Sequence, residues 1–279
     1  MSMTSSCGPL RHATLVVADL RPLIDAYRLL GLEPGEHRRV SADQARAWQR
    51  PGLAGCTTVS LSGPDSSPLL RLIELPAARP RPTRFSHGWL ALEVLVRDVD
   101  ELGRRLQNSA FEIVGAPADL AVSPAIRAMQ VIGPAGEMLY LTQVKQAVPP
   151  FELPLSARLS PEQDLGPLFI GVMSVPSREA ALDACSANPP RATFRFDTRV
   201  TVLSRALERS LDHPWPVATV QWSGASLFEI DEVNDARLLP SDEKQEPLDG
   251  LSWLTMDGPA GMEQLAPGVW LECCELKPA

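Results

Sequence analysis

Hydrophobic and polar positions alternate with two different periods along this chain, and the order of the periods repeats. The first repeat, residues 8–76, opens with an apolar, β-branched run at 10–18 and continues into apolar positions at helical spacing between Asp19 and Gly31. Extended segments follow at 55–62 and 69–75. An alternation of two residues is typical of strands and a spacing of three and four is typical of helices, so this repeat predicts a strand, a helix and further strands.

The same order returns in residues 86–145. A strand-like run begins at Gly88, and the acidic sequence from Asp98 to Glu101 has the form of a capping box that starts a helix. Extended segments follow near Ile113 and at 128–132 and 138–144, and a Gly-Pro-Ala-Gly turn at 133–136 joins the last two.

The second half repeats the order again after a proline-rich linker at 149–166. Its third unit has a strand at 168–175, a helix that begins at Ser177, and extended runs at 191–197, 217–222 and 226–233. A polar-capped segment recurs at 41–48 and 201–211. In the fourth unit only 251–256 and 269–276 are strand-like, so this unit is too short for a full repeat.

The repeats predict an α+β fold of tandem βαβββ modules that form two open barrels, with the last module degenerate. We expect an N-terminal domain at 1–148, with modules at 8–76 and 86–145, and a C-terminal domain at 167–279. Because the truncated half is thin, we expect the N-terminal barrel to carry the binding site.

Composition narrows the classes of partner. The chain has 279 residues, of which 44% are hydrophobic, and a formal net charge of −8, which argues against a nucleic-acid or anionic-membrane surface. It contains no apolar run of about 18 residues that would cross a bilayer. Five scattered cysteines without CxxC spacing predict reduced thiols in the cytoplasm.

The first two units resemble the glyoxalase/bleomycin-resistance/dioxygenase superfamily, also called the vicinal-oxygen-chelate superfamily. The motifs that carry the resemblance in the first unit are His12, Leu15-Val16-Val17, Asp19, Tyr27 and Leu30-Gly31-Leu32. Those in the second unit are Leu90–Val94, Asp98-Val-Asp100 and Gly133–Leu141. The resemblance covers residues 8–145, and beyond 165 it rests on the order of the elements alone.

The resemblance implies a site inside a barrel, with ligands to a divalent metal on the first and last strands of the units. His12 matches the first-strand ligand and Glu74 the fourth-strand carboxylate. In the second unit, Trp89 or Ala91 occupies the histidine position and Tyr140 the carboxylate position. In the third unit, Asp231 lies close to the carboxylate position.

Two protein ligands seldom hold a catalytic metal, because an open site usually keeps three. The expectation is therefore a protein without a bound cofactor. The alternative is a divalent metal held by His12, Glu74 and His87, since His87 shares the strand parity of Trp89.

Candidate roles follow from these positions. Without a metal, His12 and Glu74 would act as a base and its orienting partner, and Tyr140 would donate a hydrogen bond to a substrate oxygen. Trp89 would form a stacking wall. The other candidates for the pocket lining are Ala91, Met138 and Thr142. Tyr27 is expected in the core, and Arg71 on the surface.

Three functions remain open at this point. The first is a lyase or isomerase that acts on a small carbonyl or aromatic metabolite through His12, Glu74 and Tyr140. The second is a non-catalytic protein that sequesters an apolar or aromatic compound, as bleomycin-resistance relatives do. The third is a metal-dependent enzyme similar to glyoxalases or extradiol dioxygenases. Either a monomer or a homodimer is compatible with the tandem repeats.

Overall fold

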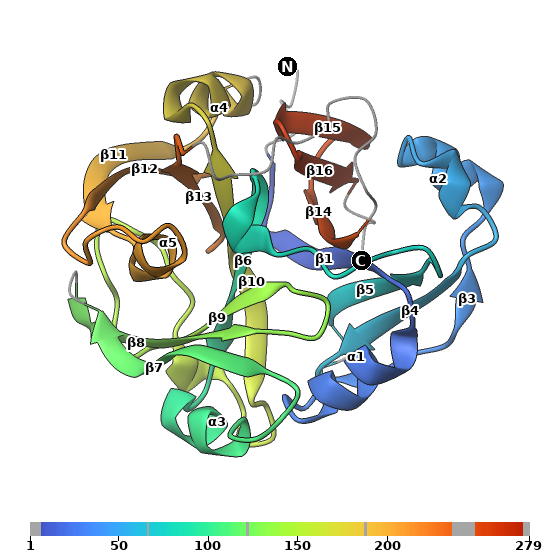
Figure 1. Ribbon diagram of the computed structural model, residues 1–279, viewed down its shortest axis with the longest axis horizontal. Helices are drawn as coiled ribbons and strands as arrows, with labels where there is room; N and C mark the ends of the chain where they lie inside the picture. The colour runs from blue at the N-terminus through green and yellow to red at the C-terminus, as the bar shows by residue number, and fades with distance from the viewer. Residues whose placement is uncertain (1–6, 66, 121–122, 187–188, 236–248, 276–279) are drawn as a thin grey trace.

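The computed structural model describes residues 7–275, except for 66, 121–122, 187–188 and 236–248. Two mixed sheets form the molecule (Figure 1). Sheet A consists of β1 (Leu10–Val17), β2 (Glu33–Pro34), β3 (Arg38–Arg39), β4 (Thr57–Ser62), β5 (Pro68–Glu74), β14 (Gly250–Asp257), β15 (Gly261–Ala266) and β16 (Val269–Cys274). Sheet C consists of β6 (Gly88–Val96), β7 (Glu112–Leu120), β8 (Ser123–Ile132), β9 (Met138–Val144), β10 (Leu165–Val175), β11 (Ala192–Arg199), β12 (Pro214–Gln221) and β13 (Leu227–Glu232).

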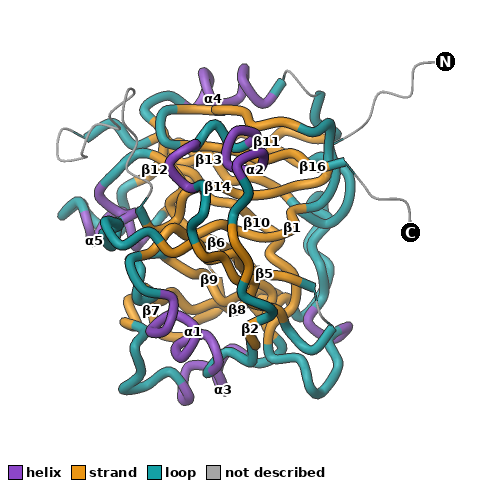
Figure 2. The backbone as a smooth tube through the Cα atoms, turned by 90° about the vertical axis from the view of Figure 1, so that its right-hand side faces the viewer, coloured by secondary structure: helices purple, strands orange, loops and turns teal. Residues whose placement is uncertain are grey.

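Helices connect these strands and begin at polar caps. The α-helices are α1 (Leu20–Arg28), α2 (Ala42–Ala47), α3 (Val99–Arg105), α4 (Arg178–Cys185) and α5 (Thr201–Ala206), and the 3₁₀ helices are η1 (Pro51–Leu53), η2 (Thr83–Phe85) and η3 (Ser156–Arg158). Asp19, Asp98 and Ser177 each accept a hydrogen bond from a backbone N–H of the first turn that follows. This local chemistry explains why the helix starts follow from the sequence. Figure 2 shows α1 and α3 at one end of the strands and α4 at the other. None of the helices in the described part of the chain is long and apolar enough to cross a membrane.

The strand order confirms the α+β fold of βαβββ modules, with a shortened last unit that has strands but no helix among its described residues. The grouping of the units into sheets does not follow their order along the chain. β1 pairs with β14, and β6 pairs with β10, so the first unit shares sheet A with the fourth while the second shares sheet C with the third. β6 and β10 are almost entirely buried, and such strands need a neighbour on both edges. The pairing between units places both strands in the middle of one sheet.

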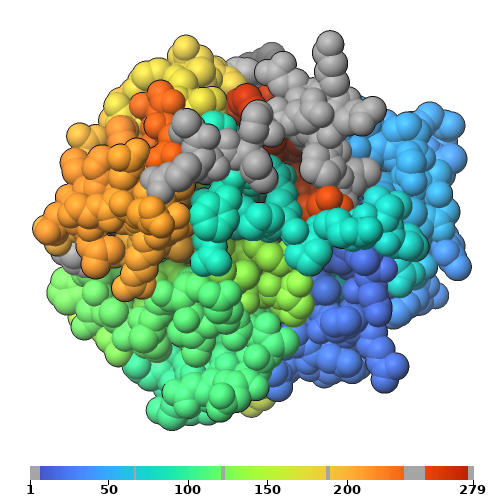
Figure 3. All heavy atoms as spheres, viewed as in Figure 1, coloured from blue at the N-terminus to red at the C-terminus, as the bar shows by residue number. Residues whose placement is uncertain are grey.

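Three hydrophobic clusters arise from this arrangement. The largest lies between the backs of the two sheets and includes Leu15, Leu72, Leu92 and Phe228. The second packs one face of sheet C against α5 and the segment 151–159. The third packs one face of sheet A against α2 and η1. We call the faces covered by the second and third clusters the inner faces of sheets C and A. In the view of Figure 3 the segment 76–87 (cyan) crosses the surface between the part of the molecule built on sheet A and the part built on sheet C.

A buried pair joins the first unit to the second. Tyr27, predicted in the core and 1% exposed, donates a hydrogen bond of 2.6 Å to Oε1 of Glu137. The backbone N–H of Ala135 donates to Oε2 at 2.8 Å. Burial raises the pKa of Glu137 to about 7, although these hydrogen bonds act in the opposite direction. The turn at 133–136 is thereby held against α1.

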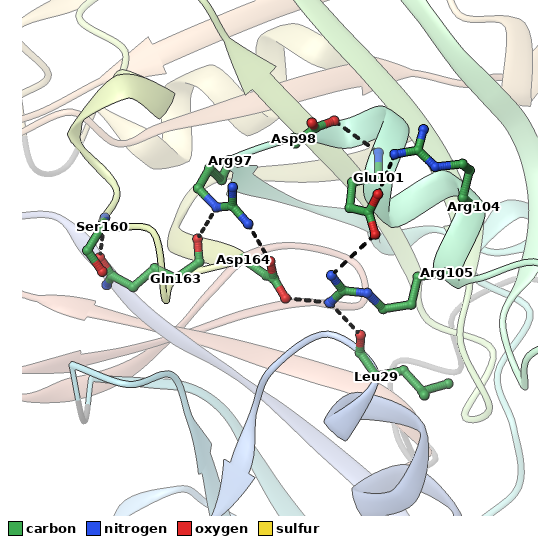
Figure 4. A network of polar contacts seen from close by, with 9 residues as sticks. All are labelled: Leu29, Arg97, Asp98, Glu101, Arg104, Arg105, Ser160, Gln163 and Asp164. Carbon is green, nitrogen blue, oxygen red and sulfur yellow. Dashed lines mark hydrogen bonds and ion pairs between the residues drawn. The ribbon is translucent and has the colours of Figure 1, made fainter.

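Asp164, in the segment before β10, binds two arginines of the second unit (Figure 4). Its carboxylate accepts a hydrogen bond of 3.2 Å from Arg97 and forms an ion pair with Arg105. Arg105 also donates to the backbone carbonyl of Leu29 just after α1. Asp164 therefore fixes the linker against both α3 and the end of α1.

We expect the substitution Asp164→Asn to lower the free energy of unfolding by about 2 kcal/mol, because two charge-assisted contacts of a mostly buried carboxylate are lost. Chemical denaturation measures this. Glu36→Gln, which breaks a surface pair with Arg38, is the control and is expected to change little. Equal stability of the two variants would contradict the prediction.

Candidate functional site

The inner face of sheet C gathers three carboxyl groups and a tyrosine from three strands. Glu93 comes from β6, Tyr140 from β9, and Glu229 and Asp231 from β13. Glu93 is in register with Tyr140, and Ile170 of β10 is in register with Glu93. The alternation of side chains along each strand places all four side chains on one face.

Sheet register also determines what lies between these groups. Val172 of β10 is paired with Glu229 on one side and with Ala91 on the other. Ser174 is paired with Asp231. The floor between the acidic strands is therefore made of apolar side chains and the small hydroxyl side chain of Ser174. β13 and β6 lie on either side of β10, so their backbones are about 10 Å apart.

Several polar atoms on this face have no hydrogen-bond partner in the described part of the chain. Asp231 is 0% exposed, and both of its carboxylate oxygens lack a partner. The hydroxyl groups of Ser174 and Thr219 lack one as well. Glu93, Tyr140 and Glu229 are half-buried. Buried polar groups in folded proteins are normally satisfied by protein, water or a ligand, so these atoms make this face the candidate site.

Burial raises the pKa of each of these four groups above its ordinary value. Burial, together with the charge of Glu229, raises the pKa of Glu93 to about 8. Burial raises the pKa of Glu229 to about 7 and raises that of Asp231 strongly. Burial and the three nearby carboxylates raise the pKa of Tyr140, so its phenol stays protonated and can donate a hydrogen bond.

Apolar and aromatic side chains surround the acidic groups. Ala91 and Met138 belong to the hydrophobic cluster on this face, and Thr142 is fully buried. Trp215 and Phe196 pack in the same cluster. The face therefore combines apolar walls with a few convergent polar groups, which is the usual composition of a small-molecule site.

The inner face of sheet A has a different character, because its charges are paired with one another. Arg71 donates a hydrogen bond of 2.8 Å to Glu272, and its guanidinium lies 4.9 Å from the ring centroid of Trp48. Glu272 also accepts hydrogen bonds from Trp48 (2.7 Å), Thr255 (2.7 Å) and Trp253 (3.3 Å). The charge of Arg71 and these hydrogen bonds lower the pKa of Glu272 to about 2, against the effect of burial. Arg71 was predicted on the surface, and that prediction is wrong.

His12 lies on this inner face, in register with Thr255 of β14. Both ring nitrogens are buried and have no partner among the described residues. Burial, with the positive charge of Arg71, lowers the pKa of His12 to about 3. The imidazole is therefore neutral at physiological pH but only a weak base.

The predicted pair of His12 with Glu74 is not assembled. Glu74 is in register with Val17, and the side chain of Val17 belongs to the cluster between the sheets. Arg71, in contrast, is in register with Thr14 and contacts the hydroxyl of Thr14 at 3.5 Å. Side chains alternate between faces, so Glu74 points away from the inner face on which His12 lies. The sequence of β5 is apolar on both faces, so alternation alone could not decide its orientation.

The predicted metal ligands do not fit a metal centre. His87 donates from Nε2 to the backbone carbonyl of Val233 at 2.9 Å, while Glu74 and His12 occupy opposite faces of sheet A. Across the described chain, no three His, Cys, Asp or Glu side chains are placed to hold a metal ion. The donor set therefore supports no step through a metal.

Trp89 does not line the inner face of sheet C either. Val172 and Met173, consecutive on β10, face Ala91 and Trp89, which are two residues apart on β6. This bulge turns Trp89 to the core between the sheets, where it is 1% exposed and donates a hydrogen bond of 2.8 Å to the carbonyl of Trp270. The predicted stacking wall is therefore a core residue.

Sequence reasoning missed Glu93, Glu229 and Glu272 as site residues. Glu93 and Glu272 both interrupt buried apolar strands, and a charged residue in such a run is the signal that could have found them. Only the non-local strand pairing brings Glu93 near Glu229.

This chain resembles known proteins in its structure, but the comparisons of its sequence found no match. No family model matches the chain, and none of the curated proteins matches its sequence. Glyoxalase I from Zea mays matches with a TM-score of 0.58 at 14% identity, over 91% of this chain and 75% of the other. A putative dioxygenase from Bacillus subtilis subsp. subtilis str. 168 matches with a TM-score of 0.57 at 11% identity, over 92% of this chain and 72% of the other. The chain thus has the vicinal-oxygen-chelate fold that the sequence motifs led us to expect.

Proposed function

We propose that this protein, which has the vicinal-oxygen-chelate fold, binds a small carbonyl or aromatic metabolite on the inner face of sheet C and moves a proton on it. The observation that carries the proposal is the group of half-buried or buried carboxyls beside Tyr140, with pKa values near neutrality. A fold hosts many chemistries, so the argument rests on these residues and not on the structural likeness.

Glu93 is the base in this proposal. A general base works best when its pKa lies near the working pH, and the pKa of Glu93 is raised to about 8. Its carboxylate would remove a proton from the carbon next to the substrate carbonyl. His12, with a pKa of about 3, has a much weaker driving force for this step.

Tyr140 stabilises the negative charge that develops on the carbonyl oxygen. The phenol is in register with Glu93 on the neighbouring strand and remains protonated. A hydrogen bond to an oxygen atom strengthens as that atom becomes an enolate, so the interaction favours the transition state. In an isomerase, protonated Glu93 returns its proton to a neighbouring atom; in a lyase, the enolate expels a leaving group from the adjacent carbon.

A second candidate is a non-catalytic binding protein that sequesters an apolar or aromatic compound. The aromatic walls around the acidic groups, among them Trp215 and Phe196, favour this candidate. It shares the site with the first and differs in the absence of turnover.

Hydrogen–deuterium exchange distinguishes the two candidates. The protein is incubated in D₂O with a panel of small ketones, aldehydes and aromatic carbonyl compounds, and loss of the α-proton signal is followed by NMR. We expect catalysed exchange for a subset of the panel, and Glu93→Gln should slow it by about 10²- to 10⁴-fold. Tyr140→Phe should slow it to a lesser extent.

Two further variants sharpen this experiment. Glu112→Gln removes an exposed carboxylate of β7 and should leave the exchange rate unchanged. If His12→Ala and not Glu93→Gln abolishes exchange, the base lies in sheet A and the assignment of Glu93 fails. Saturable binding without any exchange would favour the sequestering protein.

A further inference from the structure

We infer that the ligand of sheet C carries a positively charged nitrogen, an ammonium group seated against Asp231. This inference rests on the site of the proposed function and names the class of its ligand. It follows from the contrast between the inner faces of the two sheets.

Sheet A neutralises its buried carboxylate internally. Glu272 accepts from the guanidinium of Arg71 at 2.8 Å and from three further donors. No equivalent cation pairs with the carboxyls on the inner face of sheet C among the described residues. Of the ion pairs formed within the described residues, none involves Glu93, Glu229 or Asp231. Among the described residues, these three carboxyls thus have no paired cation.

Asp231 is the member of the group best placed to hold a cation. It is 0% exposed, and neither of its oxygens has a hydrogen-bond partner among the described residues. The hydroxyls of Ser174, in register with Asp231, and Thr219, in register with Glu229, are also unsatisfied. An ammonium group has three N–H donors, and the carboxylate and hydroxyl oxygens are acceptors for them. A neutral alcohol has one donor and leaves acceptors unsatisfied.

The surroundings of Asp231 suit the remainder of an aromatic or apolar amine. Val217 is in register with Asp231, and Trp215 and Phe196 pack in the same cluster. Aromatic faces attract cations in addition to apolar groups. Glu93 and Tyr140 lie across β10, so an amine at Asp231 can reach them with its far end when the ligand spans about two strand spacings, roughly 10 Å.

Three probes that share a phenyl ring and a short chain test the inference: 2-phenylethylamine, 2-phenylethanol and 3-phenylpropionate. Isothermal titration calorimetry at pH 7.5 measures the affinity of the full chain for each. We expect the amine to bind at least tenfold more tightly than the alcohol, and the carboxylate to bind more weakly than either. Asp231→Asn, which has nearly the same shape, should reduce amine affinity at least tenfold and remove the preference over the alcohol.

Glu112→Gln is the matched control, because it removes one negative charge from an exposed position of the same sheet. It should retain the amine preference. If Asp231→Asn does not fold, Glu229→Gln replaces it, and a reduced preference is again expected. Equal affinity for amine and alcohol, or an Asp231→Asn variant that keeps the preference, overturns the inference.

The inference and the proposed function fail separately. Amine selectivity that depends on Asp231, without proton exchange, supports the inference and refutes the catalytic role of Glu93. Exchange that depends on Glu93, without amine selectivity, leaves the proposed function intact and overturns the inference.

Discussion

Replacing Glu272 by alanine is expected to lower the free energy of unfolding by about 3–5 kcal/mol, because the substitution leaves the guanidinium of Arg71 buried without its counter-ion. The side chains of Arg71 and Glu272 are 18% and 12% exposed, so solvent replaces little of the lost interaction. The substitution also removes the acceptor for Trp48 and Thr255. Glu272 joins β16 to β14, to β5 and to the end of α2, and the effect should therefore extend across sheet A.

Urea denaturation at pH 7, followed by tryptophan fluorescence, measures this loss. Glu263→Ala, which truncates an exposed carboxylate on β15 of the same sheet, should change stability little. Glu272→Gln should cost less than Glu272→Ala, since its amide oxygen can still accept one of the hydrogen bonds. A Glu272→Ala protein as stable as the control would show that Arg71 finds solvent or another partner.

A second substitution separates the charge from the packing. In a Glu272→Ala background, Arg71→Met removes the unpaired cation and keeps an unbranched apolar chain near Trp48. Breaking a buried pair on one side is more harmful than removing both charges, so the double variant should recover part of the lost stability. No recovery would assign the loss to the hydrogen bonds of Trp48 and Thr255 instead.

The contrast between local and non-local features explains what the sequence could predict. Helix starts depend on caps a few residues away, such as Asp98 with the N–H of Glu101, and these starts were predicted. Strand pairing depends on partners far apart in the chain, such as Leu15 with Leu251. The repeat pattern therefore predicted the modules but not which modules share a sheet.

In the candidate site, too, local features could be predicted from the sequence and non-local features could not. Tyr140, Met138 and Ala91 lie on one inner face, in keeping with strand parity in the second unit. Trp89 has the parity of Ala91 but lies on the other side of a bulge, and a bulge leaves no reliable mark in a single sequence. The acidic partners of Tyr140 come partly from the third unit, so only the tertiary structure could bring Glu229 and Asp231 to it.

Raising the pH from about 4.5 to about 8 should weaken the contribution of Glu137 to stability by on the order of 3 kcal/mol, at about 1.4 kcal/mol for each unit of pKa difference. The pKa of Glu137 is about 7 in the folded chain and 4.5 as a reference, and the residue is 0% exposed. Between these values the folded chain binds more protons than the unfolded chain, so the free energy of unfolding falls as the pH rises. The contribution is complete below about pH 4.5 and lost above about pH 7. Glu93 and Glu229 act in the same direction.

The shifted pKa values of Glu272 and His12 have different effects on stability from that of Glu137. Glu272, with a pKa of about 2, contributes stability that is present above pH 4.5 and lost only as the pH falls, so it is constant across the window. His12, with a folded-state pKa of about 3 against 6.5 as a reference, makes stability rise with pH between these values. A comparison of the wild-type chain with Glu137→Gln cancels both effects, because both chains share them.

The measurement is therefore the difference in unfolding free energy between wild type and Glu137→Gln at pH 4.5, 6 and 8. Glutamine does not titrate, so any advantage of the wild-type chain should be largest at pH 4.5 and shrink towards pH 8. Tyr27→Phe provides an independent check, because Tyr27 donates to Glu137 at 2.6 Å and this bond strengthens when the acceptor is ionised. Its cost should therefore grow as the pH rises. A difference between wild type and Glu137→Gln that stays constant from pH 4.5 to 8 would mean that Glu137 titrates in the folded chain as it does in the unfolded one, and that its hydrogen bonds with Tyr27 and Ala135 offset its burial.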